Sequence, residues 1–210
     1  MTPSPVWRLP VGRLLVGLAL LGGGGAGFAA WAEDAPRLMP SRDVDITYRV
    51  LSGEKPVIER VRWLAAEEIE RIDPHGKGYI LGRSAYMIID HRGKTADIID
   101  PKTRTVTATV NPVAGELAEI ENAKLMPLGA ATVAKLACQI WQAEISAKVE
   151  REICLTEDGV LLRVRNGDQT VLQATSVTYH HIGTKIFEIP ANYKAAANAQ
   201  AIPGASYGGP

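Results

Sequence analysis

The chain has 210 residues, of which 23 are lysine or arginine and 23 are aspartate or glutamate, so its formal net charge at pH 7 is zero. A chain without an excess of either sign provides no electrostatic field for holding nucleic acid or an anionic membrane surface, and we expect neither as a partner. The length is sufficient for one domain with a sizeable buried core, so a second domain is not required.

Residues 1–32 have the pattern of a bacterial export signal. Two arginines precede an apolar run, residues 14–21, that continues through small residues to Ala30. Ala30 and Ala32 occupy the two positions that a signal peptidase reads, so we expect the mature chain to begin at Glu33. The alternative is an uncleaved inner-membrane anchor, although a span requires about 20 apolar residues and this run falls slightly short. In both cases the charges around the run place the rest of the chain in the periplasm.

The rest of the chain is expected to form a single β-rich periplasmic domain over residues 33–194 and a disordered tail over residues 195–210. The tail is rich in small residues, glycine and proline, and it has too few apolar residues to build a core. No cysteine lies near the predicted cleavage site, so there is no acceptor for a lipid anchor. We therefore expect no membrane span once the signal is cleaved.

The clearest predicted strand covers residues 43–50, where apolar and polar residues alternate. Its apolar residues share one face of an extended chain, and they are Val44, Ile46, Tyr48 and Val50. One face should therefore pack on a core while the other meets solvent. Residues 104–110 repeat the pattern, and we expect Val106, Ala108 and Val110 to point inward.

The next part of the chain contains one ambiguous segment, residues 56–73. Its apolar residues fit one face of a helix, but they also fit two strands joined by a turn at residues 65–68, and we favour the strands. Residues 85–90 and 95–99 are predicted as short strands, because turn-forming residues follow each of them. Residues 113–124 fit a short helix.

Cys138 and Cys154 are the only two cysteines, and in an exported chain they are expected to form a disulfide because the compartment is oxidising. Residues 136–144 and 148–156 are predicted as two strands that fold back around Ser146. In a hairpin centred there, Cys138 lies directly opposite Cys154, at a separation that suits a disulfide. Further turn signals follow this hairpin, so the domain is predicted to be a meander of antiparallel strands.

Several sequence runs are shared with a known group of proteins. They are R-D-V-D-I-T-Y at residues 42–48, M-I-I-D at 87–90, V-A-K-L-A-C-Q-I-W at 133–141, C-L-T-E-D-G-V-L-L-R at 154–163 and F-E-I-P-A-N-Y at 187–193. On these runs the chain resembles an exported proteobacterial family of unknown function. That family is similar in strand pattern to the LolA/LolB periplasmic lipoprotein carriers.

The resemblance implies a mainly β fold with one disulfide. The sheet would be a curved antiparallel meander or an open half-barrel, LolA-like, with helices lining one side. Sequences of the family usually place a glycine where this chain has Lys135. The departure implies that the turn before Cys138 does not require a positive φ here.

Some predicted strands are apolar on both faces. Met87 and Ile89 share one face of their strand, while Tyr86 and Ile88 share the other. Such a strand must be covered on both sides, either by ordinary core, which is the simpler interpretation, or by an apolar ligand. As a face for a hydrophobic ligand we single out Tyr86, Ile88 and Leu161.

No sequence motif supports catalysis or a metal centre. Asp43 and Asp45 point to the same face of one strand and could share a cation, although a solvated strand face is the simpler interpretation. The histidines lie in turns or at adjacent positions that point to opposite faces, which favours surface roles. They are His75, His91, His180 and His181. We expect no enzyme activity, no cofactor and no metal.

These observations favour a non-enzymatic periplasmic envelope protein. It would bind a hydrophobic ligand, either a lipid or an acyl group, or another envelope protein, in the concavity of a curved sheet. The alternative is a structural or assembly module that works through a protein partner and has no ligand pocket.

Overall fold

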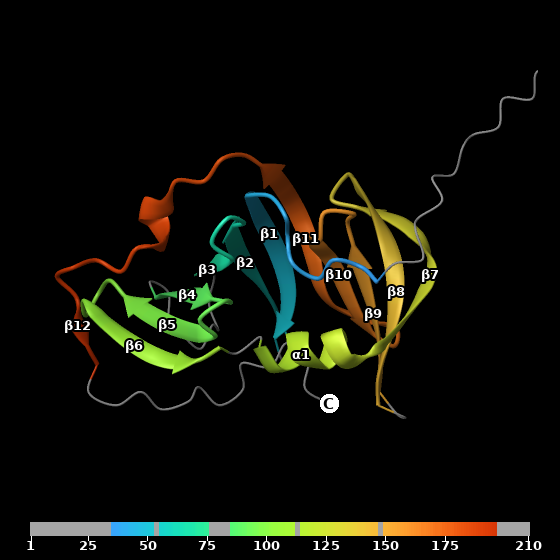
Figure 1. Cartoon of the computed structure of the whole chain (residues 1–210), viewed down its shortest axis with the longest axis horizontal. Helices are drawn as coiled ribbons and strands as arrows, with labels where there is room; N and C mark the ends of the chain where they lie inside the picture. The colour runs from blue at the N-terminus through green and yellow to red at the C-terminus, as the bar shows by residue number, and fades with distance from the viewer. Residues whose placement is uncertain (1–34, 53–54, 76–84, 112–113, 147–148, 197–210) are drawn as a thin grey trace, which may run out of the picture. The chain divides into compact units, whose positions relative to one another are not determined.

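A computed structural model describes residues 35–52, 55–75, 85–111, 114–146 and 149–196. Their strands belong to one sheet (Figure 1). In chain order the elements are β1 (Val44–Ser52), β2 (Lys55–Leu64), β3 (Ile69–His75), β4 (Tyr86–Asp90), β5 (Thr95–Asp100), β6 (Thr105–Val110), α1 (Ala114–Asn122), β7 (Lys124–Val133), β8 (Leu136–Ser146), β9 (Val149–Leu155), β10 (Leu161–Asn166), β11 (Gln169–Tyr179), the 3-10 helix η1 (Thr184–Phe187) and β12 (Lys194–Ala195).

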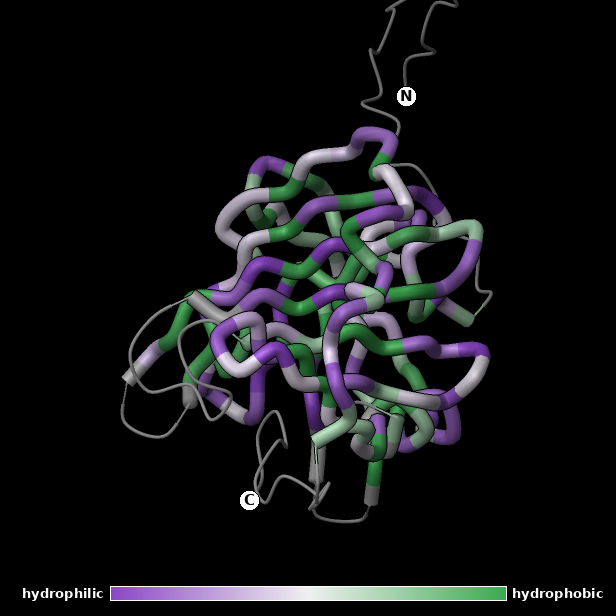
Figure 2. Tube along the Cα trace, turned by 90° about the vertical axis from the view of Figure 1, so that its left-hand side faces the viewer, coloured by the Kyte–Doolittle hydropathy of each residue, from purple (hydrophilic) through white to green (hydrophobic). Residues whose placement is uncertain are grey.

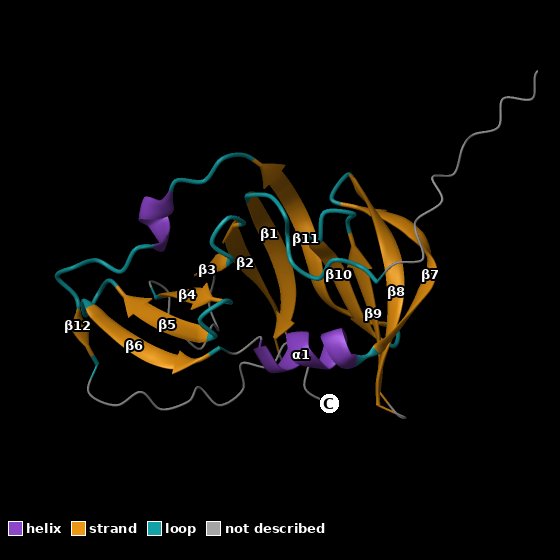
Figure 3. Cartoon of the chain, in the orientation of Figure 1, coloured by secondary structure: helices purple, strands orange, loops and turns teal. Residues whose placement is uncertain are grey.

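Most neighbours in the sheet are also neighbours in the sequence. The strand order is β12-β6-β5-β4-β3-β2-β1-β11-β10-β9-β8-β7. Every pairing is antiparallel except that of β12 with β6. Strands β1 to β6 form one meander and β7 to β11 form another, and the pairing of β1 with β11 joins them (Figure 3). The prediction of a mainly β fold with a single open antiparallel sheet is confirmed.

The alternation predicted for the first strand organises the core. Four alternate apolar side chains of β1 are at most 6% exposed, and they are Val44, Ile46, Tyr48 and Val50. Arg49 lies between two of them and is exposed. Figure 2 shows a similar alternation of hydrophobic and hydrophilic residues along the neighbouring strands. We call the face of the sheet that carries these four side chains the inner face and the opposite one the outer face.

The ambiguous segment at residues 56–73 forms two strands, as the sequence favours. β2 and β3 pair in register, with Val61 opposite Ile72. Glu68, in the turn between them, has a φ of 55°. The short helix is also confirmed, because α1 lies within residues 113–124.

The predicted orientation of residues 104–110 is wrong. In β6, Thr107 pairs with Ile98, and Ile98 packs against the main core cluster of the inner face. Val106, one position away, therefore faces outward, and Val110 is 70% exposed. Alternation shows which residues share a face, but threonine and valine are both common in strands, so it did not show which set meets the core.

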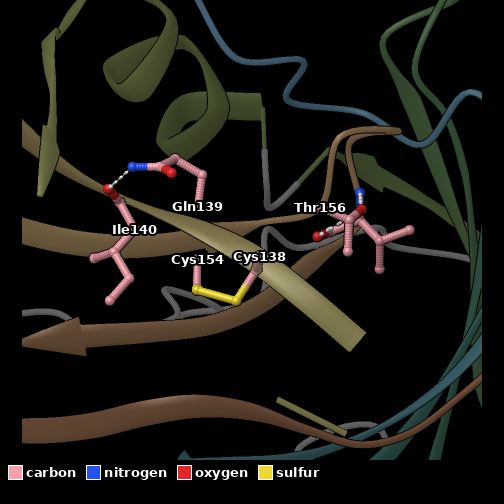
Figure 4. The surroundings of a disulfide bond; sticks show 6 residues. Cys138, Gln139, Ile140, Cys154 and Thr156 are labelled. Atoms are coloured by element: carbon pink, nitrogen blue, oxygen red, sulfur yellow. Dashed lines mark hydrogen bonds between the residues drawn. A yellow bond between two sulfur atoms is a disulfide. The ribbon is translucent and has the colours of Figure 1, made fainter. Parts of the chain in front are cut away.

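The predicted disulfide is confirmed, but the predicted register of its hairpin is not. Cys138 and Cys154 are bonded, with their Cα atoms 5.5 Å apart (Figure 4). The residue opposite Cys154 is Ile140, two positions from the expected partner. Most pairs of the hairpin, such as Glu144 with Glu150, are centred one position beyond Ser146. A turn that moves by one residue changes the register by two.

The turn between β7 and β8 differs from what the resemblance implies. Val133 pairs with Leu136, which leaves Ala134 and Lys135 as the two turn residues. Their φ values are 49° and 68°, so both lie in the left-handed region that favours glycine or asparagine. The expectation that Lys135 avoids a positive φ is therefore wrong.

The ends of the chain are described only in part. The predicted export signal, with Ala30, Ala32 and Glu33, lies outside the described residues. At the other end Ala195 belongs to β12, and the Ala196 amide donates to the Val106 carbonyl at 2.8 Å. These two residues of the predicted tail are therefore part of the sheet, and the remainder of that tail lies outside the described residues.

Candidate functional site

A cavity of about 190 Å³ lies against the inner face of the sheet. Strands β1, β2, β3, β9, β10 and β11, helix α1 and the segment before β1 all contribute to its wall. The lining residues are Leu38, Met39, Pro40, Ile46, Tyr48, Glu59, Val61, Trp63, Glu70, His91, Leu117, Ile120, Arg151, Gly159, Leu161, Val164, Val171 and Leu172. Most of these side chains are apolar, because alternate positions of the strands point inward.

A few polar side chains interrupt the apolar wall. Glu59 is only 2% exposed, and it points inward because it pairs with Tyr48 across β1 and β2. Glu70 lies on the same face of β3, and its Oε2 atom is 2.9 Å from Nε2 of His91. On the far wall, Nε of Arg151 donates to Oδ1 of Asn166 at 3.2 Å. The cavity therefore combines a large apolar surface with a small number of fixed polar groups.

Tyr48 lies between these polar groups. Its hydroxyl donates to the carbonyl of Leu161 at 2.7 Å, which links β1 to β10 across the cavity wall. Burial raises the pKa of Tyr48, and the negative charges of Glu70 and Glu59 raise it further. The hydroxyl therefore stays neutral and acts as a hydrogen-bond donor.

Residues 35–42 run over the cavity, and we call them the strap. Trp63 Nε1 donates to the Pro40 carbonyl at 2.8 Å, and the Ser41 amide donates to the Asp158 carbonyl at 2.9 Å. The Arg42 guanidinium pairs with the Asp158 carboxylate at 2.8 Å and stacks over the ring of Tyr179, 4.0 Å from its centroid. Leu38 and Met39 are only partly buried. A few polar contacts thus hold the strap, and its apolar side chains line the cavity.

Asp158 and Gly159, in the turn between β9 and β10, are in direct contact with the strap. Burial alone raises the pKa of Asp158, but hydrogen bonds from Thr156, Arg42 and Tyr179 lower it, so the net pKa is below its ordinary value of 3.8. Gly159 has a φ of 90°, and a Cβ there would collide with the backbone of Met39. The turn between β9 and β10 therefore needs glycine both for its own conformation and for the close approach of the strap.

A second hollow, of about 530 Å³, lies on the outer side of the strap. It shares Leu38, Met39, Pro40 and Trp63 with the cavity. Its other lining residues are Ala35, Pro36, Arg37, Ser41, Ala65, Glu68, Glu121 and Leu125. Charged and polar side chains thus make up a larger part of this outer hollow.

The C-terminal segment, residues 180–196, covers part of the outer face, and we call it the arm. Ile182 and Phe187 are buried in a cluster with Leu64. Tyr193 packs against a second cluster, made of Tyr86, Ile88 and Ile99. Arg71 fixes the arm to the sheet, because its guanidinium donates to the Ile186 carbonyl at 2.7 Å and stacks 3.6 Å from the centroid of the Tyr86 ring. The second apolar face of β4 is therefore covered by the protein itself.

The structure does not bring the predicted ligand-face residues together. Tyr86 and Ile88 lie under the arm on the outer face. Leu161 lines the cavity on the inner face. Of the three, only Leu161 is placed to contact a ligand in this cavity, and that role stays a prediction.

One prediction about polar residues is corrected, and the geometry does not support the alternative of a cation shared by two aspartates. The expectation of a surface role fails for His91, whose side chain is 7% exposed and lines the cavity. Asp43 and Asp45 do not share a site, because Asp45 pairs with Arg60 while Asp43 accepts hydrogen bonds from the Ala65 and Ile182 amides. In the described parts of the chain there is no group of three or more metal-ligating side chains.

One cavity residue that was not predicted, Glu59, had a signal in the sequence. Glu59 falls in the inward series Val57, Glu59, Val61 and Trp63 of β2, where it is the one charged member. An acidic residue in an otherwise apolar series indicates a polar group in the core, and such groups require a partner or a function. His91 continues the inward series of Met87 and Ile89 just beyond the end of β4, but its turn sequence favoured a surface interpretation.

The comparisons with known proteins agree on the fold. No protein-family model matches the sequence, and no curated protein matches it. An uncharacterized conserved protein from Thermus thermophilus is similar in structure, with a TM-score of 0.53 and 13% identity over 74% of this chain and 90% of that one. MucB is similar with a TM-score of 0.52 and 12% identity over 73% of this chain.

The match spans 59% of the MucB chain. MucB has also been solved in the Pseudomonas aeruginosa MucA/MucB complex. A LolA superfamily protein from Nitrosomonas europaea overlaps with a TM-score of 0.36 and 11% identity, over 71% of this chain and 91% of that one. At these identities the likeness to the Thermus protein and to MucB shows a shared fold, and it confirms the expected type of sheet. Over the described residues, no helix is long and apolar enough to cross a membrane.

Proposed function

We propose that this chain is a non-enzymatic binding protein of the bacterial envelope, whose ligand is a lipid or an acyl group held in the cavity on the inner face. Export through the signal at residues 1–32, a periplasmic location and a single domain are parts of the same proposal. The observation that carries it is an apolar cavity with few polar groups, enclosed by an open sheet, α1 and the strap.

The composition of the wall supports an apolar ligand. Small-molecule sites are lined mainly by hydrophobic and aromatic side chains, with a few placed polar groups that orient the ligand. Here the apolar members include Val61, Leu161 and Val171, while the Glu70–His91 pair supplies one fixed polar position. Apolar cavities of about 150 Å³ stay dry and bind benzene, so a cavity of this size and composition favours apolar groups over water.

A protein partner is the second candidate, and a different observation favours it. β7 is an outer edge of the sheet in the described chain, and Leu128 on it is 51% exposed. An unpaired edge accepts an added strand through main-chain hydrogen bonds. MucB, which shares the fold, is known in complex with MucA(peri).

The test is direct binding by the exported protein. Native mass spectrometry of protein purified from the periplasm should show a co-purifying lipid or fatty acid, and the stripped protein should bind the apolar dye N-phenyl-1-naphthylamine. Leu117→Trp fills the cavity from α1 and should raise the dissociation constant about threefold or more. Ala118→Trp is the matched control, because Ala118 is exposed on the same helix. Purified protein that carries no lipid and, after stripping, binds no dye would overturn the proposal in favour of the protein partner.

A further inference from the structure

The strap divides the space over the inner face into two compartments. Leu38, Met39 and Pro40 line both the cavity and the outer hollow, and Trp63 also borders both. These residues therefore separate a mostly apolar compartment from a more polar one. If the strap moved away, the two compartments would join.

The strap is held more loosely than a buried segment. Its polar anchors include the Pro40 carbonyl, the Ser41 amide and the Arg42 side chain, and the Arg42 side chain is 61% exposed. Exposed ion pairs contribute little to stability, because solvent screens the attraction between the charges. The side chains of Leu38 and Met39 are only partly buried against the rest of the protein. Displacement of the strap thus breaks few contacts, and an apolar ligand can replace the apolar ones.

The volumes also indicate that a ligand of ordinary size can enter the cavity only if the strap is displaced. Sites that bury a drug-sized ligand measure about 300–1,000 Å³. The cavity, at about 190 Å³, is smaller than this range, while the outer hollow measures about 530 Å³. With the strap in place, the cavity has room for little more than one small ring. The outer hollow alone lies within that range, so displacement of the strap is what would let a ligand extend from the hollow into the cavity.

We propose that the strap, residues 35–42, is a displaceable cover, and that the ligand is a single-chain amphiphile whose chain takes the places of Leu38 and Met39. This inference rests on the proposed function and names the ligand class of the same site. The apolar chain lies in the cavity, and the polar end stays in the outer hollow beside Glu68 and Glu121, which lie outside the strap. A chain that replaces two side chains fits the width of one acyl group, not two.

The first test measures competition by the strap. Leu38→Ala with Met39→Ala should lower the dissociation constant for lauroyl-lysophosphatidylcholine about threefold or more, because less of the site is occupied in the free protein. Arg42→Ala, which removes an anchor outside the cavity, should also lower this dissociation constant. Arg60→Ala is its matched control, since Arg60 is 53% exposed and pairs with Asp45 on the outer face. Dilauroyl-phosphatidylcholine, with two chains, should bind at least about tenfold more weakly than the single-chain lipid.

The second test observes the strap itself and does not depend on altered variants. Saturation of the wild-type protein with lauroyl-lysophosphatidylcholine should speed hydrogen exchange of the Ser41 amide, which donates to Asp158, and leave the amide of Ile46 in β1 unchanged. If the dye and the lipid bind but Ser41 exchange and the strap variants are unchanged, the inference is overturned while the proposed function stands. If neither wild type nor strap variants bind any apolar probe, both are overturned.

Discussion

The strap and the arm are two covers on opposite faces of one sheet, and they differ in how completely they fill the space beneath them. The arm buries Ile182 and Phe187 to 4% and 7% exposure and ends as β12, paired with β6. The strap forms no strand, and hollows lie on both sides of it. A tightly packed cover completes a core. A loosely packed cover leaves a site that a ligand can take.

The largest expected effect comes from a substitution in the arm, which is the tightly packed cover. Phe187→Ala should lower the free energy of unfolding by about 3–5 kcal/mol, because it removes a buried aromatic side chain from the arm. Urea denaturation measures this change. Leu38→Ala in the strap is the comparison variant, and it should cost less than about 2 kcal/mol since Leu38 is only partly buried. Equal costs for the two variants would contradict the distinction between the covers.

The disulfide should stabilise the sheet without affecting either cover. Cys138→Ser with Cys154→Ser should lower the free energy of unfolding by about 3 kcal/mol, because the bond closes a loop between residues separated by 16 positions. Neither cysteine lines the cavity. The dissociation constant for N-phenyl-1-naphthylamine, measured at a temperature where both proteins are folded, should therefore stay the same. A loss of dye binding in the folded variant would show that the bond shapes the site.

The turn between β7 and β8 offers a stabilising change that affects neither cover. Ala134→Asn with Lys135→Gly should raise the free energy of unfolding by about 1 kcal/mol, because both native residues have positive φ values. Thermal unfolding measures the gain. Ala137→Gly is the control. Ala137 is an exposed residue within β8, and glycine there should destabilise the protein.

The smallest expected effect is a pH dependence of the strap. The folded-state pKa of Asp158 is lower than its ordinary value of 3.8, so the ionised carboxylate stabilises the folded strap fully above that value. The stabilisation is lost as the pH falls through the lowered pKa. Ser41 exchange, corrected for its intrinsic pH dependence, should therefore speed up relative to that of Ile46 below about pH 4. Asp158→Asn should remove this acid transition, and an unchanged transition would contradict the role of Asp158.

Local sequence patterns predicted the strands well. The alternation of β1, the two strands at residues 56–73 and the disulfide all follow from side-chain periodicity, turn residues and the expectation of an oxidising compartment. The register of the β8–β9 hairpin did not follow, because a difference of one residue in the position of the turn moves every pair by two. The orientation of β6 failed for a related reason, since the sequence shows alternation but not the direction of the core.

The site was harder to predict than the fold, because it depends on segments that are distant in the sequence. Leu161 was found from its strand, but the strap before β1 is held beside it by contacts with residues distant in the sequence, among them Trp63 and Asp158. Tyr86 and Ile88 have the composition of a ligand face, and the arm covers them from about 100 positions later in the chain. A strand that is apolar on both faces predicts that both faces are covered. It does not show whether the cover is another part of the protein or a bound ligand.

The most direct test of the account is a methyl NMR titration of the stripped wild-type protein with lauroyl-lysophosphatidylcholine below its micelle concentration. Methyl groups of Val61, Leu161 and Val171 line the cavity and should shift and show contacts to the acyl chain. Methyl groups of Ile88 and Ile99 lie under the arm and those of Ile182 belong to it, and all of these should stay unchanged. Contacts under the arm, or the absence of any shift in the cavity at saturating lipid, would contradict the claim that the inner face holds the ligand.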